Sequence, residues 1–387
     1  MSETITDTPA AQHHRAAPRP DRPLWTVLLR WAVALAVLLV LLYVPLIATR
    51  PWLRTGEYAM IGAVGAIGLT LLSGQAGQLS LAHGFFLLTG GVGYVVLTAP
   101  TGRSELGFGL PPILGLVGAV ALSALLGLAF APVSGRLRGI YLGVASLSLV
   151  FIGLYLGQSL SSLAGTTSRG RDPVPFSIFG IGFGDPEPGK PVFQLLGVPL
   201  TATERLWYLF LALTVIAAVL ATAAVRGRPG RAWRAVRDNE AAASVLGVSV
   251  VRAKAGAFAV SSGYAGLAGA MTVLWFGLLK PDESEYGTYG INVSIAFLAM
   301  IIVGGLGSVL GAVIGAVLVF GLPLALPILT SGSSLLSGTG GGAITPIILT
   351  QFIYGAAIIA VVMFEPGGLA AIGRRLGTLL SRRGREG

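Results

Sequence analysis

The run LWYLFLALTVIAAVLATAAV, residues 206–225, contains twenty consecutive residues without a charge. A helix of that length rises about 30 Å, which matches the hydrocarbon core of a bilayer. Similar runs recur along the 387 residues, of which 54% are hydrophobic and 11% charged, and the mean hydropathy is +0.80. Soluble domains carry about 25% charged residues. The sequence therefore predicts an all-α, polytopic membrane protein built as a helix bundle.

We expect about ten transmembrane or re-entrant helices within a permease domain at 24–366. The second and eighth runs are short and the third is interrupted by glycines, so these three could be re-entrant. The expected spans are 24–48, 57–73, 77–99, 110–131, 138–160, 206–225, 254–279, 291–304, 308–329 and 344–364.

Basic residues set the expected orientation. The net charge is +10, and arginines gather in four places: the polar tail 1–23, the turn at Arg136 and Arg138, the stretch 226–254, and the tail 367–387. An acidic PDESEYG at 281–287 and the loop 161–205 fall on the opposite side. The positive-inside rule then puts both termini in the cytoplasm. Basic residues at membrane borders explain the charge, so we expect no nucleic-acid partner.

The stretch GRAWRAVRDNEAAASVLG, residues 230–247, lies directly after the opening run. Arg234 and Asp238 stand four residues apart, and Trp233 and Val236 share one helix face. Asp238 or Asn239 suits the N-cap of EAAASVL, and Gly247 suits a left-handed C-terminal position. A helix this short needs a partner surface. A bilayer-bound linker is one interpretation, but the small alanine-lined face favours a protein groove.

A second stretch, GQAGQLSLAHGFFLLTGG at 74–91, places polar groups within or near the bilayer. Such groups are costly there unless they face a cavity or a partner, so they indicate a translocation path. Packing between helices, with Gln and Ser bonding across them, is the alternative. No metal site is expected, since no second histidine or carboxylate accompanies the histidine. The candidate path residues are Gln75, Gln78, Ser80 and His83.

Five blocks in the chain resemble the permease subunits of branched-chain (hydrophobic) amino acid ATP-binding cassette (ABC) importers, and they follow the family's order. They favour the M-type subunit over the shorter H-type. The blocks are GQLSLAHGFF (77–86), RLRGIYLGVASLSLVFI (136–152), the stretch 230–270, SIAFLAMIIVGGLGSVLGAVIGA (294–316) and FEPGGLAAIGRR (364–375).

The resemblance implies a transport subunit of a bacterial inner membrane, driven by ATP that partner subunits bind, with no cofactor of its own. Implied partners are a sister permease, two cytoplasmic ABC ATPases, an extracytoplasmic solute-binding protein and the lipid bilayer. The implied solute is a branched-chain or other hydrophobic amino acid, with urea, amides or another small solute as alternatives. The implied ATPase-coupling residues are Arg234, Arg237, Asp238, Glu240, Ala241, Ala242 and Gly247.

Other features qualify this interpretation. Where the family commonly has a TGGSDG-like loop, AGTTSRGRDPVP (164–175) inserts Arg169 and Arg171. A small-residue repeat permits close helix packing, within one subunit or between two. Its glycines are Gly304, Gly305, Gly307, Gly311 and Gly315.

Enzymatic motifs are not found. The chain has no cysteine, and the P-loop-like spacing at 184–190 ends in Pro191 where Ser or Thr is required. An ion-coupled secondary transporter is a competing interpretation that would need carboxylates within the spans, and Glu57 and Glu365 are expected at span borders. A passive channel or a structural membrane protein is the other competitor.

Overall fold

The structure is a computed structural model. It describes residues 24–101, 105–137, 139–165, 169–178, 181–184, 194–195, 198–282 and 289–330, with short pieces at 352, 355–356, 359–360, 363 and 368–371. The contacts divide the chain into two units, residues 1–46 and residues 47–387, and each is described by itself. The first holds most of helix α1 (Leu24–Ile47), an apolar helix with Pro45 near its end.

The second unit is helical, with only two-residue strands in its described loops. Its helices are α2 (Arg50–Leu69), which continues as a π-helix η1 (Thr70–Gln75), α3 (His83–Thr98), α4 (Pro112–Arg136), α5 (Ile140–Ser159), α6 (Ser161–Ala164), α7 (Ala202–Arg226), α8 (Arg228–Asp238), α9 (Glu240–Val245), α10 (Val250–Phe276), α11 (Ile291–Gly304), α12 (Val309–Ala316), the π-helix η2 (Val317–Gly321) and α13 (Leu322–Thr330). The strands pair as antiparallel hairpins, β1 (Ser177–Ile178) with β2 (Ile181–Gly182) and β3 (Gln194–Leu195) with β4 (Val198–Pro199).

Six helices among the described residues are long and apolar enough to cross a membrane. They fall in the regions of six of the ten expected runs, and three shorter apolar helices, at 32–47, 83–98 and 291–304, fall in three more. The interruption expected in the third run is confirmed, because residues 77–82 precede α3 without forming a helix. The tenth run, 344–364, lies mostly outside the described residues.

One expectation about Glu57 is wrong. The helix expected to begin at 57 begins at Arg50, so the Glu57 carboxylate lies two turns inside α2 and is fully buried. The π-helix at its other end extends the span to Gln75. This second span is therefore long, and the sequence argument against ion coupling loses one of its premises.

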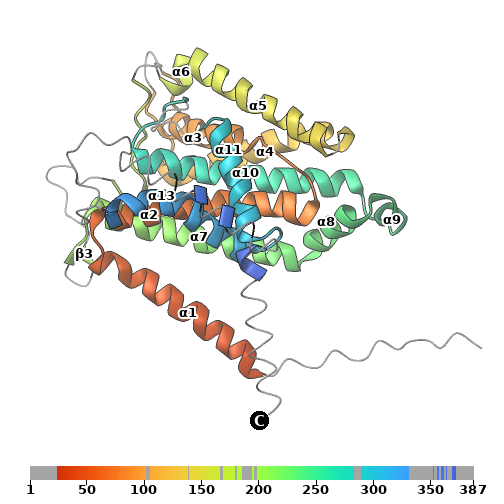
Figure 1. The fold of residues 1–387 in the computed structure, drawn as a ribbon. Helices are drawn as coiled ribbons and strands as arrows, with labels where there is room; N and C mark the ends of the chain where they lie inside the picture. Colours follow the sequence, from red (N-terminus) through yellow and green to blue (C-terminus); the bar gives the residue numbers. More distant parts are fainter. Residues whose placement is uncertain are drawn as a thin grey trace, which may run out of the picture. The chain divides into compact units, whose positions relative to one another are not determined.

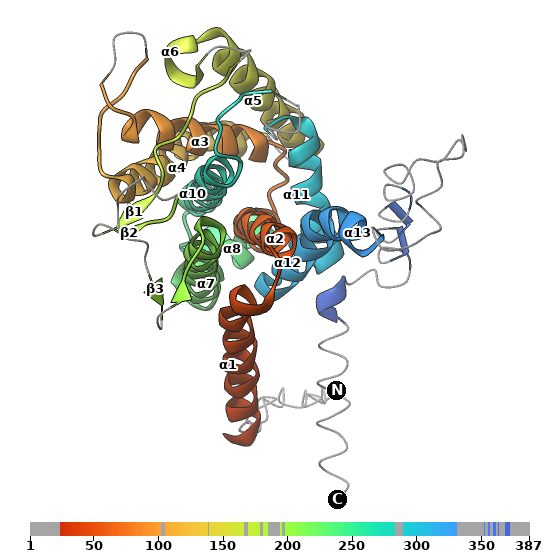
Figure 2. The same ribbon diagram turned by 90° about the vertical axis from the view of Figure 1, so that its left-hand side faces the viewer.

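Helix α10 lies in the middle of the second unit, between α4 and α2 (Figure 2). Its sequence is rich in glycine and alanine, which let helices approach closely where lipid gives little hydrophobic drive. A Cβ added at Gly90 of α3 would lie 2.0 Å from the carbonyl oxygen of Gly266 in α10. At this point no side chain fits between the two helices, so Gly90 and Gly266 set their spacing.

The two ends of the long helices differ. Helices α8 and α9 and the turn between α4 and α5 lie at one end, and α6 and the hairpins lie at the other (Figure 1). Arg136, the arginines of α8, and Arg252 therefore share one end, as the charge pattern predicts. In the following we call these the α8 end and the hairpin end.

Candidate functional site

The basic stretch forms two short helices, α8 and α9, joined at Asn239. The Asn239 side chain accepts a hydrogen bond from the backbone N–H of Ala242 at 3.0 Å, so Asn239 is the N-cap of α9. Gly247 follows α9 with φ of +81°, a left-handed conformation that favours glycine. Both features were predicted from the sequence, and together they give α9 defined ends despite its length.

Helix α8 is held against the bundle by its apolar face. Trp233 and Val236 are each 3% exposed, which confirms that they share a buried face. Pro229 stands in the first turn, where its missing N–H costs nothing. Arg234 and Arg237 lie beside this face, so its burial fixes where their guanidinium groups can reach.

Two of these arginines bind the end of α2. Arg234 donates through Nη1 to Gln75 Oε1 and to the carbonyl oxygen of Val225, both at 3.0 Å. Arg237 donates through Nη1 to the carbonyl oxygen of Gly74 at 2.6 Å. Arg234 and Asp238, although spaced at i and i+4, do not form an ion pair with each other. Asp238 instead forms an ion pair with Arg237 at 3.0 Å.

Gln75 continues this network into a third part of the chain. Its Nε2 donates to the carbonyl oxygen of Gly307 at 2.7 Å, in the turn between α11 and α12. Gly307 has φ of +80°, so the turn needs glycine there. Segments more than 150 residues apart in sequence thus meet at one glutamine. We call Gln75, Arg234, Arg237 and the carbonyls that they bind the glutamine junction.

Helix α9 is attached on one side and exposed on the other. Lys254 Nζ lies 2.8 Å from Glu240 Oε1, and the lysine side chain is only 6% exposed. Ala243 is buried, while Val245 and Leu246 are 87% and 80% exposed. Ala241 and Ala242 are exposed as well. The tip therefore presents two large apolar side chains that the described part of the chain leaves uncovered.

The break between η1 and α3 contains the other path candidates, and all of them are buried. His83 Nε2 lies 2.9 Å from the carbonyl oxygen of Gly65, with its ring against Phe297. Ser80 Oγ accepts a hydrogen bond from the backbone of Ala82 at 3.3 Å. Gln78 differs, because neither atom of its side-chain amide has a hydrogen-bond partner in the described part of the chain. Such an orphaned group calls for an explanation.

These contacts bear on the two interpretations of the polar stretch without deciding between them. Gln75 and His83 are engaged in bonds between helices, as the packing alternative expects, and Gln78 is not. A path role for Gln75, Gln78, Ser80 and His83 stays a prediction. Of the four, Gln78 has the geometry that most needs a further partner.

The repeated glycines bring α11 and α12 together within this chain. A Cβ added at Gly304 would lie 2.0 Å from the carbonyl oxygen of Gly311, and one added at Gly315 would lie 2.0 Å from that of Met300. Gly305 ends α11 with φ of +106°. The tight crossing positions the Gly307 turn that the junction uses.

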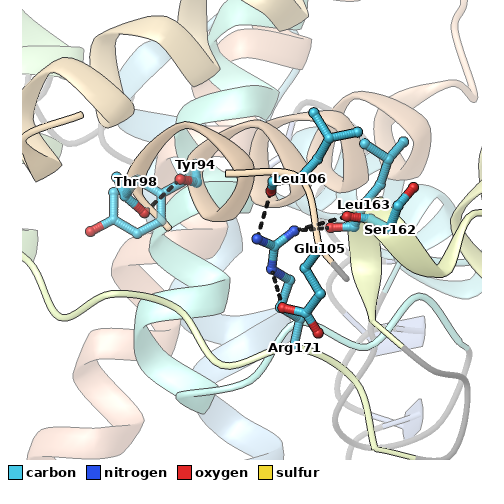
Figure 3. A network of polar contacts seen from close by, with 7 residues as sticks. All are labelled: Tyr94, Thr98, Glu105, Leu106, Ser162, Leu163 and Arg171. Carbon is cyan, nitrogen blue, oxygen red and sulfur yellow. Dashed lines mark hydrogen bonds and ion pairs between the residues drawn. The ribbon is translucent and has the colours of Figure 1, made fainter. Parts of the chain in front are cut away.

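At the hairpin end, the Arg171 side chain joins the short helix α6 to the loop that holds Glu105 and Leu106 (Figure 3). Arg171 donates to the carbonyl oxygens of Leu106, Ser162 and Leu163 at 2.6, 3.2 and 3.0 Å and forms an ion pair with Glu105 at 3.2 Å. Burial lowers the pKa of its guanidinium, and the Glu105 carboxylate opposes that shift. Arg171 also exchanges backbone hydrogen bonds with Leu279. We call this arrangement the Arg171 cluster.

From the sequence, Arg171 was noted only as an insertion in the loop 164–175, and no contacts were predicted for it. Its role as the centre of a cluster depends on segments that are separate in the sequence and share no pattern, namely α6 and the loops at 105–106 and 279. A single buried arginine with several carbonyl acceptors has no signature in one chain, so this cluster was missed.

Comparisons with known proteins agree with these features. A family described as the permease component of branched-chain amino acid transport systems matches residues 55–362. The chain is 30% identical over 281 residues to the high-affinity branched-chain amino acid transport system permease protein LivM of Salmonella typhimurium, covering 71% of this chain. It is 29% identical over 180 residues to the LivM protein of Escherichia coli, covering 45% of this chain and 41% of that protein.

The match spans 63% of the length of the Salmonella relative. No solved structure matches the chain.

Proposed function

The chain belongs to the family of branched-chain amino acid transport system permease components, and from that premise we propose that it is the M-type permease of an ATP-driven importer. It is a transport subunit rather than an enzyme. In this proposal two cytoplasmic ATPases hydrolyse ATP, a sister permease completes the path, and an extracytoplasmic binding protein delivers the solute. The solute is a branched-chain or other hydrophobic amino acid, and the membrane is the bacterial inner membrane.

The apolar tip of α9 is the observation that carries the coupling role. Val245 and Leu246 are almost fully exposed, whereas the base of the same segment is fixed by Trp233, Arg234 and the Glu240–Lys254 pair. Exposed apolar groups on a segment rigidly joined to a bundle fit a surface that another protein covers. The ATPase is the partner that a permease of this family would meet there.

The glutamine junction gives this contact a route into the bundle. A force on α9 passes to α8, and Arg234 connects α8 to Gln75 at the end of the central helix α2. Directly beyond Gln75 lies the segment with the unpartnered amide of Gln78. We infer that a shift of α8 repositions this segment, and that Gln78 then lines the path of the solute.

Docking is tested by Leu246→Asp. The charged side chain at the tip should abolish co-purification of the ATPases and ATP-driven uptake, because a carboxylate cannot be buried in an apolar groove. Phe108→Asp is the matched control, since Phe108 is 59% exposed near the hairpin end. Normal recovery of the ATPases with Leu246→Asp would exclude the tip as the contact.

Orientation is tested by cysteine labelling, because the native chain has no cysteine. Ser244→Cys at the α8 end should react with a membrane-impermeant maleimide only after the cells are opened. Asp172→Cys at the hairpin end should react in whole cells, and both positions are exposed. The reverse pattern would turn the proposed topology over, including both cytoplasmic termini.

The solute and the energy source are tested in proteoliposomes that hold the complete assembly. We expect leucine uptake that requires ATP and that urea and acetamide do not inhibit. The buried Glu57 is the observation that favours ion-coupled transport as a second candidate. Uptake driven by a proton or sodium gradient without ATP, and lost in Glu57→Gln, would establish that candidate instead.

A further inference from the structure

A cavity of about 310 Å³ opens at the hairpin end, between the ends of α2, α7 and α10. Its volume is at the lower limit of the roughly 300–1,000 Å³ that small-molecule sites occupy. The lining combines aromatic and aliphatic side chains with two arginines. The lining includes Arg50, Arg54, Phe176, Phe183, Leu206 and Trp275.

Part of the cavity wall is fixed by hydrogen bonds. This part consists of Pro173, Pro175, Phe176, Phe183 and Gly184. Arg205 of α7 donates to the carbonyl oxygens of Gly182 and Gly184, the latter at 2.9 Å. The Tyr94 hydroxyl donates to the carbonyl oxygen of Val174 at 2.9 Å. Arg205 is 5% exposed, so these bonds are shielded from water. The cavity is therefore held open by specific contacts.

Arg54 has hydrogen-bonding capacity to spare in this cavity. Its Cζ lies over the Trp275 ring at 4.4 Å from the centroid, which is a cation–π contact. The indole N–H donates to the backbone oxygen of Arg54 at 3.2 Å, which fixes the two residues together. Within the described residues the guanidinium donates no hydrogen bond. Its unused N–H groups can therefore donate to the two oxygens of a carboxylate.

The charges around Arg54 also favour an anion. Arg50, one turn earlier on α2, lines the same cavity, and none of the residues that line it is acidic. Glu57 lies one turn further into the bundle and interacts with Arg54, but it is fully buried and does not line the cavity. The lining thus carries two positive groups. Only Arg54, the one nearer the core, has a carboxylate close by, that of Glu57 on the side away from the cavity.

We propose that this cavity binds the carboxylate of a small apolar acid, with Arg54 holding both oxygens and with Leu206, Trp275 and Phe176 contacting the apolar body. This inference rests on the proposed function, and under it the ligand is an α-amino acid with an apolar side chain, held at the hairpin end before it enters the bundle. The arginine sets the class of solute, because urea and simple amides have no carboxylate.

The experiment uses the complete transporter in proteoliposomes and a diazirine-bearing leucine analogue as the probe. After illumination, mass spectrometry should find the label on peptides that contain Leu206 and Trp275. Arg54→Gln should lower this labelling about tenfold, because one charge-assisted bidentate contact is lost. Arg50→Gln, at an exposed position, should lower it about twofold. Arg54→Lys is a second variant that keeps the positive charge next to Glu57 and should therefore still fold. Because lysine lacks the paired donors of arginine, it should lower labelling several-fold.

Competitors separate the two ends of the ligand. 4-Methylpentanoic acid, which keeps the carboxylate of leucine, should displace the probe, and 3-methylbutylamine, which lacks it, should not. Equal displacement by the amine would overturn the inference, and so would labelling that ignores Arg54→Gln. In a third outcome, Arg54→Gln leaves labelling unchanged but abolishes docking of the binding protein. Arg54 would then bind an acidic side chain of that protein, and the inference would also be overturned.

Failure of the inference is distinguishable from failure of the proposed function. A wild-type assembly that takes up leucine with ATP but never labels the cavity would overturn the cavity alone. A wild-type assembly with no ATP-driven uptake of any apolar amino acid would overturn the function on which the cavity depends.

Discussion

The Arg171 cluster and the glutamine junction use the same chemistry at opposite ends of the helices, and they differ in exposure and in partners. Arg171 is 3% exposed and binds three backbone carbonyls and a carboxylate. At the junction Arg234 is half-buried and binds the Gln75 side chain as well as one carbonyl, and Arg237, which also binds a carbonyl, is 40% exposed. A side chain can change rotamer and release its partner, whereas a carbonyl of a packed loop cannot. We therefore expect the cluster to maintain the structure and the junction to exchange contacts during transport.

The largest expected effect tests the structural half of this comparison. Arg171→Gln should lower the free energy of unfolding by about 3 kcal/mol, because it removes a buried guanidinium from an ion pair and leaves several carbonyls unpaired. Thermal unfolding of the purified protein in detergent measures this. Arg169→Gln is the control, since Arg169 is exposed and belongs to the same insertion, and it should change stability by less than about 0.5 kcal/mol. Equal effects of the two would remove the distinction.

Glu240 provides the next test, at the α8 end. Glu240→Lys places two positive groups together at Lys254, which is nearly buried, and should cost about 2 kcal/mol and detach α9. The double variant Glu240→Lys with Lys254→Glu restores opposite charges. It should recover most of both stability and ATPase co-purification. If the double variant is no better than the single one, the pair does not position α9.

Arg234→Ala sharpens the comparison by separating stability from transport. We expect a loss of only about 1.5 kcal/mol, since the site is half-buried, but a large rise in ATP hydrolysed per solute moved. A cycle with Gln75→Ala should show a coupling energy of about 1 kcal/mol between the two residues. Additive effects, or ATP use that stays tied to uptake, would contradict the role of the junction.

The smallest effect is expected for Arg237→Ala. Its carbonyl bond to Gly74 and its pair with Asp238 are partly exposed, so the loss should be about 0.5–1 kcal/mol and should shrink further in high salt. Unfolding measured at low and high salt checks this. A loss as large as that of Arg171→Gln would show that exposure does not separate the two ends.

Periodicity and apolar length predicted most of the helices, because in a membrane they are nearly the only constraint on backbone structure. The N-cap at Asn239 and the left-handed Gly247 followed from local rules in the same way. The start of α2 was missed, since Arg50, Arg54 and Glu57 make its first turns appear polar. Arg54 is accommodated by its contact with Trp275, and Glu57 by burial that only the folded chain provides.

The sequence predicted the two stretches 74–91 and 230–247 as separate sites. It did not predict that they contact each other. Arg234 was expected to pair with Asp238 by spacing, but a helix neighbour four residues away offers a weak interaction of about 0.3–0.5 kcal/mol. Gln75 is brought within reach by the packing of α2, α7 and α8, a long-range contact that one sequence does not encode visibly. The cavity at Arg54 is formed by three helix ends and a loop. It was not predicted from the sequence because it also depends on long-range contacts.

The π-helical turn that ends α2 has a geometric consequence of its own. Such a turn holds one residue more than the α-helix around it. If η1 were rewound to α-geometry, Gln75 would rotate by about 100° about the helix axis and advance by about 1.5 Å. An exchange of backbone hydrogen bonds at 70–75 would then break the bonds of the Gln75 side-chain amide to Arg234 and Gly307 in a single step. The same exchange would also rotate Gln78.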